Sequence, residues 1–191
     1  AVAPCFDGAL VLEPPNLLFC RDTNGDGKAD ERIVLLSGFG GIESPEHAGN
    51  GLLRGIDNWY HLSQHNLEFR IWMEHGTPRI QTRPTPSHGQ WGIAEDALGR
   101  LYYTPNSNPL LADLYPKHWG PINPRASAAG LGMDIMRDTS CWPIHPTPGV
   151  NRGYQEQSLR KDGTLANLTA AYGTMILHNS ALLPSRSEEH T

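Results

Sequence analysis

The sequence predicts an all-β fold, a partial β-propeller of about three to four blades of antiparallel strands. One pattern occurs twice, at Gly51–Ser63 (GLLRGIDNWYHLS) and at Gly92–Thr104 (GIAEDALGRLYYT): apolar residues, an aspartate-containing turn and an aromatic strand. Counted from Tyr60 to Tyr102, the period is 42 residues, and propeller blades repeat every ~40 to 50 residues. The 191 residues also include 20 Gly and 16 Pro, a composition that favours short strands and turns over long helices.

The length sets how much of a propeller this chain can form. At roughly 40 to 50 residues per blade, 191 residues cannot close a ring of six or more blades, so we expect a fragment of a larger, six-bladed or similar propeller. Residues 1–185 are assigned to this domain. The final six residues, 186–191 (RSEEHT), resemble the translation of a sequencing-adapter read and are expected to lie outside the fold. The alternative for them is an ordinary polar tail.

The first strands of the chain are marked by turn residues. A turn at Asp7–Gly8 is expected to precede a short apolar strand that ends near Leu12. The prolines of EPPN (13–16) end that strand, because proline cannot donate to a central ladder. Two further strands, LLFC (17–20) and RIVLL (32–36), are then expected to pair, with an acidic loop as their connection.

That acidic loop, DTNGDGKADE (22–31), has side-chain oxygens at positions 1, 3, 5 and 9 of an EF-hand-like turn. The candidate ligands are Asp22, Asn24, Asp26 and Asp30. Hard oxygen ligands at alternate positions suit Ca²⁺, and Gly27 stands at the sharp bend. Position 12 is Ile33 where an EF-hand has a bidentate Glu. The alternative is a hairpin whose carboxylates accept hydrogen bonds from their own backbone.

The remaining elements follow the same reasoning. LEFRIW (67–72) predicts a strand, and PRIQTRPTPSHGQW (78–91) predicts an extended, proline-punctuated segment. Beyond Asn106 we expect a long insertion on the top face of the propeller, with one helical turn near Leu111–Tyr115. A turn at Asp162–Gly163 and a strand at Met175–Leu177 are assigned to a further blade. The aromatic residues expected in the blade core are Trp59, Tyr60, Trp91, Tyr102 and Tyr103.

Charge and cysteine spacing exclude some functions. The formal net charge is −5 and no basic run occurs, which argues against a nucleic-acid partner. The three cysteines fall in no CxxC or CxxCH spacing, so this chain carries neither a zinc ribbon nor a covalent haem site. Cys5 and Cys20 could pair in an oxidising compartment, or they could be buried free thiols.

Several segments, taken in order, carry a family resemblance: EPPNLLFCRDTNGDGKADE, EHAGNGLLRGIDNW, GQWGIAEDALGRLYY, NSNPLLADL and WPIHPTPGVNRGYQ, followed by LRKDGTLANLTAAYG. They resemble the N-terminal propeller of the membrane-bound dehydrogenases of planctomycete-type bacteria, also called PVC-type c-haem-binding proteins. The resemblance implies a periplasmic or extracytoplasmic protein, membrane-associated at full length, that passes electrons to a c-type haem module. Because no CxxCH motif is present, that haem c module would lie outside this chain.

A more distant resemblance concerns the candidate active site. The spacing His47-x(4)-Leu52-x(2)-Gly55-x-Asp57 is similar to a motif of the soluble glucose and sorbosone dehydrogenase propellers, in which the histidine is the base beside the quinone cofactor PQQ. The Gly-Asp-Gln-Gly that follows in that family is Leu-Ser-Gln-His (62–65) here. The resemblance implies a PQQ-type sugar or alcohol dehydrogenase with a c-type cytochrome module as electron acceptor.

Such an enzyme needs a base for the substrate hydroxyl and a cation near the quinone oxygens. Neutral imidazole suits the first task, and His47 is the candidate base. Arg152 is the candidate cation, because it would stabilise the negative charge that develops on the quinone. His65 and Gln90 are predicted to line the same central funnel and contact the cofactor. The alternative for all four is a structural role in loops, caps and hairpins.

A second hypothesis comes from a different functional class. The chain could be a non-catalytic β-propeller that binds carbohydrate or a protein partner and orients a redox module. A propeller fold hosts both kinds of function, so the fold itself does not choose between them.

Overall fold

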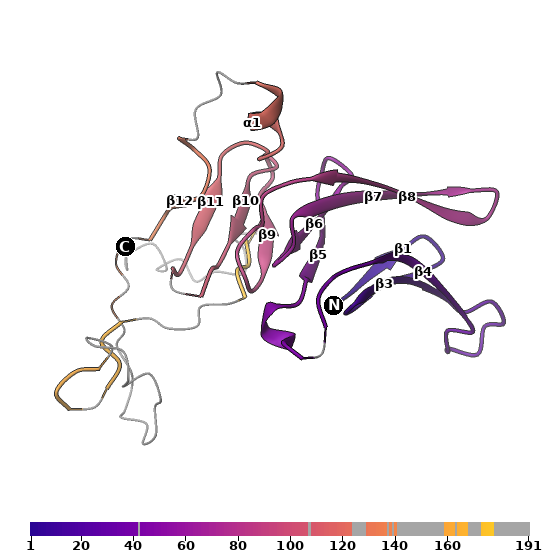
Figure 1. Ribbon diagram of the computed structural model, residues 1–191, viewed down its shortest axis with the longest axis horizontal. Helices are drawn as coiled ribbons and strands as arrows, with labels where there is room; N and C mark the ends of the chain where they lie inside the picture. The colour runs from indigo at the N-terminus through magenta and orange to yellow at the C-terminus, as the bar shows by residue number, and fades with distance from the viewer. Residues whose placement is uncertain are drawn as a thin grey trace.

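The computed structural model describes residues 1–41, 43–106, 108–123, 129–136, 138, 140, 159–162, 164–167 and 173–177. Within them the chain forms three four-stranded antiparallel sheets (Figure 1), which confirms the all-β prediction. Neighbouring strands in each sheet are consecutive in the chain. Arg152, Cys141 and the 186–191 tail lie outside the described residues. None of the described helices is long and apolar enough to cross a membrane.

The first sheet contains β1 (Val2–Cys5), β2 (Gly8–Glu13), β3 (Asn16–Arg21) and β4 (Glu31–Ser37). The predicted pairing of the LLFC and RIVLL segments is confirmed, with the acidic loop as the connection between β3 and β4. The first turn lies one residue earlier than predicted, at Phe6–Asp7, because Gly8 already pairs with Cys5. A Cβ on Gly8 would lie 2.3 Å from the carbonyl oxygen of Cys20, so only glycine fits this strand position.

The two thiols of the first sheet are free and buried. Cys5 lies on β1 and Cys20 on β3, and β2 separates these strands. Two strand spacings are roughly 10 Å, beyond the Cα separation of about 7 Å that a disulfide can bridge. Of the two alternatives for these cysteines, the structure therefore has the free thiols.

The second sheet contains β5 (Asn50–Arg54), β6 (Tyr60–Ser63), β7 (Leu67–Glu74) and β8 (Thr77–Pro84), and the predicted strand at 67–72 is confirmed as part of β7. A 3-10 helix, η1 (Pro45–His47), precedes β5. The predicted extended segment at 78–91 divides into β8 and a loop. Beyond the sheet, β7 and β8 continue as a two-stranded ribbon (Figure 1).

The third sheet contains β9 (Ile93–Glu95), β10 (Leu101–Tyr103), β11 (Leu111–Asp113) and β12 (Met133–Asp134). The predicted helical turn at 111–115 is wrong, because Leu111–Asp113 is a strand paired with β10. The helical turn is α1 (Trp119–Ile122), which lies in the connection between β11 and β12. The predicted strand at Met175–Leu177 is also wrong, since these described residues form no strand.

The internal repeat is real, but its register differs by one residue from the predicted one. Arg54 pairs with Tyr60 in the second sheet, and Glu95 pairs with Leu101 in the third. Tyr60 therefore corresponds to Leu101, not to Tyr102, and the structural period is 41 residues. Trp59, Trp91 and Tyr102 are only half-buried, whereas Tyr60 and Tyr103 are in the core as predicted.

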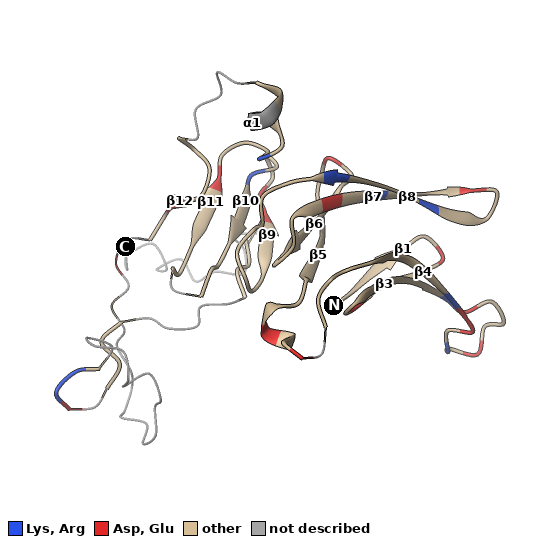
Figure 2. Cartoon of the chain, in the orientation of Figure 1, with Lys and Arg blue, Asp and Glu red and all other residues tan. Residues whose placement is uncertain are grey.

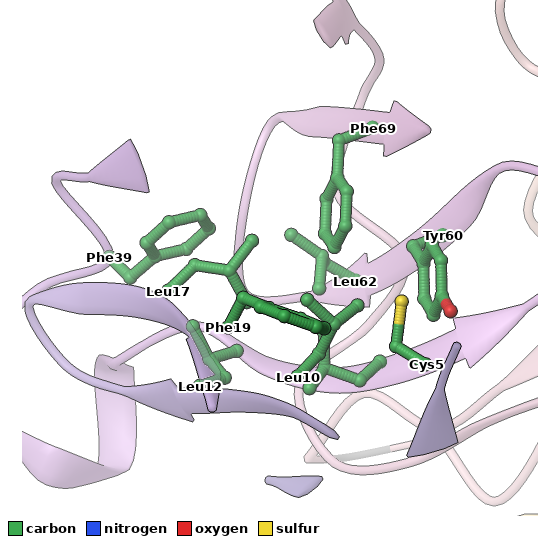
Figure 3. Packing of buried hydrophobic residues seen from close by; sticks show 10 residues of the cluster. Cys5, Leu10, Leu12, Leu17, Phe19, Phe39, Tyr60, Leu62 and Phe69 are labelled. Carbon is green, nitrogen blue, oxygen red and sulfur yellow. The ribbon is translucent and has the colours of Figure 1, made fainter. Parts of the chain in front are cut away.

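The largest hydrophobic core lies between the first and second sheets (Figure 3). Tyr60 and Phe69 stack with ring centroids 4.9 Å apart and an interplanar angle of 6°. Leu10, Leu17 and Phe19 contribute from the first sheet and are fully buried. Aromatic rings bury large apolar areas, so this packing holds the two sheets together.

The first strands of the three sheets stand next to one another. β1 contacts β5, β5 contacts β9, and β4 contacts β8 at the outer side of the first two sheets. Each strand of a sheet runs opposite to its neighbour, so the connections alternate between two ends. The η1 end comprises the connections 14–15, 38–49, 64–66, 85–92 and 104–110. The turns 55–59 and 96–100 lie at the other end of β5 and β9, hereafter the turn end.

Candidate functional site

Charged side chains are buried where the second and third sheets meet. Figure 2 shows charged positions on β7, β8 and β11 in this part of the molecule. Five titratable side chains in this part of the molecule are buried: His61, Glu68, His88, Asp113 and Lys117. Charged residues are almost never fully buried unless they are paired, so each of them needs an account of its partners.

His61 and Arg83 together bind two carboxylates. His61 Nε2 lies 3.4 Å from Asp57 Oδ1, and His61 Nδ1 lies 3.2 Å from Glu68 Oε1. Arg83 Nη2 lies 2.6 Å from Glu68 Oε2 and 3.1 Å from Asp57 Oδ2. The guanidinium also covers the ring of Trp59, with Cζ 3.9 Å from the centroid. Two cations thus alternate with two anions around the start of β6 and β7.

The pKa values follow from this arrangement. Burial opposes the charge on His61, but the carboxylates of Asp57 and Glu68 outweigh it and raise the pKa of His61 to about 9. Burial likewise opposes the charge on Glu68, yet His61 and Arg83 lower its pKa to about 2. The pKa of Asp57 is also lowered to about 2, because His61 and the backbone N–H of Trp59 offset its burial. All of these groups are therefore ionised at neutral pH.

A second buried group lies next to the first, around Asp113. Tyr103 donates its hydroxyl hydrogen to Asp113 Oδ1 at 3.0 Å, and the backbone N–H of Gly132 donates to the same oxygen at 2.7 Å. Asp113 Oδ2 lies 3.4 Å from Lys117 Nζ and 3.6 Å from His88 Nε2. Lys117 also donates to the carbonyl oxygen of Ser87 at 2.9 Å. This group ties the start of the 114–132 connection to the loop before β9.

His88 is fully buried and stays neutral. Neither ring nitrogen has a hydrogen-bond partner among the described residues. Its ring makes edge-to-face contacts with His61 and Tyr103, at centroid distances of 5.9 and 5.6 Å. Burial, together with the positive charges of Lys117 and His61, lowers the pKa of His88 to about 3. The imidazole therefore contributes packing and not charge at neutral pH.

A cavity of ≈ 240 Å³ opens beside the His61 group at the turn end. Its apolar and aromatic walls come from Ile56, Leu98, Leu101, Leu114, Tyr115, Pro116 and Trp119. Its polar wall consists of His61, Asp57, Glu68 and Glu95. Buried polar groups on one side and aromatic rings on the other are typical of small-molecule sites.

Gly55 makes the polar wall possible. A Cβ at this position would lie 2.6 Å from His61 Nε2, 2.8 Å from Asp57 Oδ1 and 3.0 Å from Glu95 Oε1. The φ of Gly55 is not positive, so the space and not the backbone conformation requires glycine here. Three polar groups from β6, β9 and the turn between β5 and β6 thus face one spot above the Gly55 backbone.

The η1 end brings three of the residues predicted for the active site into neighbouring loops. Gln64 donates its N–H to Gly89, Asn50 Nδ2 donates to the carbonyl oxygen of Gln90, and Gln90 Nε2 donates to that of Glu46 at 3.4 Å. His65 contacts Gly38 and packs on Phe39. His65 and Gln90 therefore connect neighbouring loops. Such contacts are the structural role that was the alternative to cofactor binding for both residues.

His47 ends η1 and its side chain is exposed. Its Nδ1 lies 3.0 Å from the hydroxyl oxygen of Ser44. This contact orients the ring and leaves Nε2 as the nitrogen available to a substrate. No hydrogen bond joins the His47 ring to His65 or Gln90 within the described residues. The Gly55 and Asp57 of the same sequence motif lie at the other end of β5, beside His61.

The acidic loop uses its side chains on its own backbone. Asp22 accepts hydrogen bonds from the N–H groups of Asn24, Gly25 and Gly27, and the bonds from Gly27 and Gly25 lower its pKa. Asp30 accepts from the N–H and the hydroxyl of Thr23. No three His, Cys, Asp or Glu side chains converge as a metal site within the described part of the chain. These bonds match the hairpin alternative, and Ca²⁺ stays a prediction.

The buried His61 and Asp113 groups were not predicted from the sequence. A signal was present for part of them, because His61 and Glu68 stand at strand positions flanked by buried residues, where a polar side chain needs a partner. For His88 and Lys117 there was no such signal, since both lie in loops. His88 meets Asp113 only through packing between the sheets, and Lys117 meets it because the chain turns back after β11.

In a comparison with protein-family models, residues 1–191 match the family described as "Domain of unknown function (DUF7133)". No curated protein and no solved structure matches the chain.

Proposed function

The chain belongs to the DUF7133 family, and we propose that it is part of a β-propeller that serves as a binding module for a small carbohydrate. The sheets support the propeller, because each is a four-stranded meander and their first strands stand side by side. The first strands begin at residues 2, 50 and 93, spacings within the ~40 to 50 residues of a blade. Three such sheets make an open arc.

The observation that carries the binding function is the cavity at the turn end. Its volume of ≈ 240 Å³ is below the roughly 300 to 1,000 Å³ of pockets for drug-sized ligands, and it suits one sugar ring. Trp119 and Tyr115 offer flat apolar faces for such a ring. Asp57 and Glu95 offer carboxylate oxygens to its hydroxyl groups, and hydrogen bonds to ionised acceptors are strong ones.

The experiment is a binding titration of the full-length protein with a panel of monosaccharides that includes glucose and glucosamine. We expect Trp119→Ala to weaken binding by roughly tenfold, since its exposed ring contributes to the ligand site and little to the core. Trp72→Ala is the matched control, because Trp72 is similarly exposed but lies on the β7–β8 ribbon outside the cavity. Absence of binding to every member of the panel would overturn the proposal.

A second candidate function, oxidation of a sugar or alcohol at the η1 end, is favoured by one contact. Ser44 orients His47 as a general base would require, with Nε2 available. The described residues at that end do not by themselves fit the PQQ cofactor, however. PQQ is an anionic quinone, and the described residues of the connections 14–15, 38–49, 64–66, 85–92 and 104–110 include no Lys or Arg, whereas Glu43 and Glu46 lie next to His47. The candidate counter-charge, Arg152, lies outside the described residues.

This second candidate is tested by equilibrium binding of PQQ to the full-length protein, followed by turnover with an artificial electron acceptor. If the histidine is the base, His47→Ala should lower turnover by roughly a hundredfold or more, with an unchanged melting temperature. Failure to bind PQQ would remove this candidate. The periplasmic location and the c-type cytochrome partner depend on the same family resemblance and stay proposals with it.

A further inference from the structure

Glu95 differs from the other carboxylates of the cavity because it has no cationic partner. Its Oε2 accepts a hydrogen bond from the N–H of Ile56 at 2.9 Å. No donor among the described residues bonds its Oε1, and no ion pair joins it to a Lys, Arg or His there. Asp57 and Glu68, by contrast, share His61 and Arg83 between them.

The charges around the cavity therefore do not balance. His61 and Arg83 neutralise Asp57 and Glu68, and Glu95 adds a negative charge that no described cation matches. Although His61 Nε2 faces the same spot above Gly55 as Glu95 Oε1, the two carboxylates of its own network already hold the imidazolium. A carboxylate partly buried without a partner is costly, and a ligand cation would remove that cost.

The walls opposite Glu95 also suit a cation. Trp119 and Tyr115 line the cavity, and the faces of aromatic rings attract ammonium groups within about 6 Å of the ring centroid. His61 and Glu68, at 4 % and 1 % exposed, line the cavity as well. They fix the polar wall and are not free to rearrange around a ligand, so the unmatched carboxylate determines which charge the ligand carries.

We infer that the ligand of this cavity is an amino sugar, a hydroxylated ring with one ammonium group, and that Glu95 binds this ammonium. The inference rests on the proposed binding function and deepens it by naming the class of ligand. Hydrogen bonds that join a donor to a charged acceptor are the stronger kind, so the amine should dominate the choice between otherwise similar sugars.

Isothermal titration of the full-length protein with glucosamine and with glucose, at pH 6.5 and low salt, tests this directly. We expect glucosamine to bind at least roughly tenfold more tightly than glucose. In Glu95→Gln, which keeps the shape of the side chain, the preference for glucosamine over glucose should fall below about twofold. Glu74→Gln, an exposed carboxylate on the β7–β8 ribbon, is the control and should keep the full preference.

The outcomes separate this inference from the proposed function. Equal binding of both sugars by the wild type, weakened in Trp119→Ala, would overturn the amino-sugar inference and leave the binding function in place. Binding of neither sugar would overturn both. If Glu95→Gln does not fold, the wild type still decides. The preference for glucosamine should shrink between low salt and 1 M NaCl, by less than for an exposed pair, because a partly buried charge pair is still screened in part. A preference that salt leaves unchanged would contradict the role of Glu95.

Discussion

Arg83 Nη2 lies 2.6 Å from Oε2 of Glu68, a carboxylate whose side chain is 1 % exposed. The pair joins β8 to β7, and His61 on β6 binds the other oxygen of the same carboxylate. One buried anion thus connects three neighbouring strands of the second sheet, at the place where the third sheet packs against it.

Removal of that anion should destabilise the fold strongly. Glu68→Gln leaves two cations, His61 and Arg83, with one fewer buried counter-charge, and breaking a buried pair in this way costs about 3 to 5 kcal/mol. Urea unfolding measures the change. Glu74→Gln, whose exposed pair with Arg79 is worth about 1 kcal/mol or less, provides the comparison. Similar losses of stability in both variants would show that the buried Glu68 ion pairs stabilise the fold no more than an exposed ion pair does.

Above neutral pH, the free energy of unfolding should decrease because His61 loses its proton. Its pKa is about 9 in the folded protein and roughly 6.5 in the unfolded chain. Because the folded pKa is raised, this stabilisation is fully present below about pH 6.5 and is lost as the pH rises through about 9. Urea unfolding should show a decline of about 3 kcal/mol in the free energy of unfolding over this interval, and His61→Gln should remove the decline. A flat wild-type profile would contradict the ionised network.

At acidic pH, the free energy of unfolding should decrease because His88, Asp57 and Glu68 become protonated. The folded pKa of His88 is about 3, so its contribution is present above roughly pH 6.5 and is lost as the pH falls toward 3. Asp57 and Glu68, with folded pKa values of about 2, lose their contribution below roughly pH 4.5. Together with His61, these shifts place the stability maximum near pH 6.5. His88→Asn should flatten the upper part of the acidic limb in the same unfolding experiment.

Gly55→Ala should damage both fold and cavity. The added methyl group would lie 2.6 Å from His61 Nε2, so the polar wall must shift, and overpacking of this kind costs about 1 to 3 kcal/mol. Glucosamine binding should fall by at least roughly tenfold, because Asp57 and Glu95 move apart with the ring of His61. Titration and thermal unfolding of the same sample measure both effects. Wild-type affinity in this variant would mean that the ligand does not use this wall.

The acidic loop gives a prediction that separates its two interpretations. If Ca²⁺ binds there, chelation should lower the melting temperature of the full-length protein, and Asp26→Ala should abolish that sensitivity. Asp26 is the suitable position, since its side chain accepts a backbone bond only from Lys28, whereas Asp22 supports three N–H groups whether or not a metal is bound. A melting curve indifferent to chelation identifies the loop as a hairpin.

The strands were predictable where local pattern and packing agree. The LLFC segment is a continuous apolar run whose residues are all buried, RIVLL is the apolar part of the next strand, and the two segments pair as expected. A helical turn was predicted at Leu111–Tyr115, whose two leucines and one alanine favour helix. Pairing of Leu111–Asp113 with β10 and the hydrogen bond from Tyr103 to Asp113 outweigh that local preference. The Tyr60 register was misread because the period was counted between tyrosines, Tyr60 and Tyr102. The strand pairing, with five residues in both turns, matches Tyr60 to Leu101 instead.

The candidate site was much less predictable. Its cavity takes residues from the turns 55–59 and 96–100, from β6, β7, β9 and β10, and from the segment 114–119. Only the packing of the second sheet on the third brings them together. Sequence motifs pointed to His47, which lies at the η1 end, while the Gly55 and Asp57 of the same motif lie beside the cavity. The spacing of a motif along the sequence does not show that a strand, here β5, places His47 at one end of the sheet and Gly55 and Asp57 at the other.

The most direct measurement is an experimental structure of the full-length protein with bound glucosamine. The account predicts the sugar in the cavity at the turn end, with its amino nitrogen within about 3 Å of a Glu95 oxygen and its ring against Trp119. A ligand bound at the η1 end, against Nε2 of His47, would contradict the account and favour the oxidation of a sugar there instead.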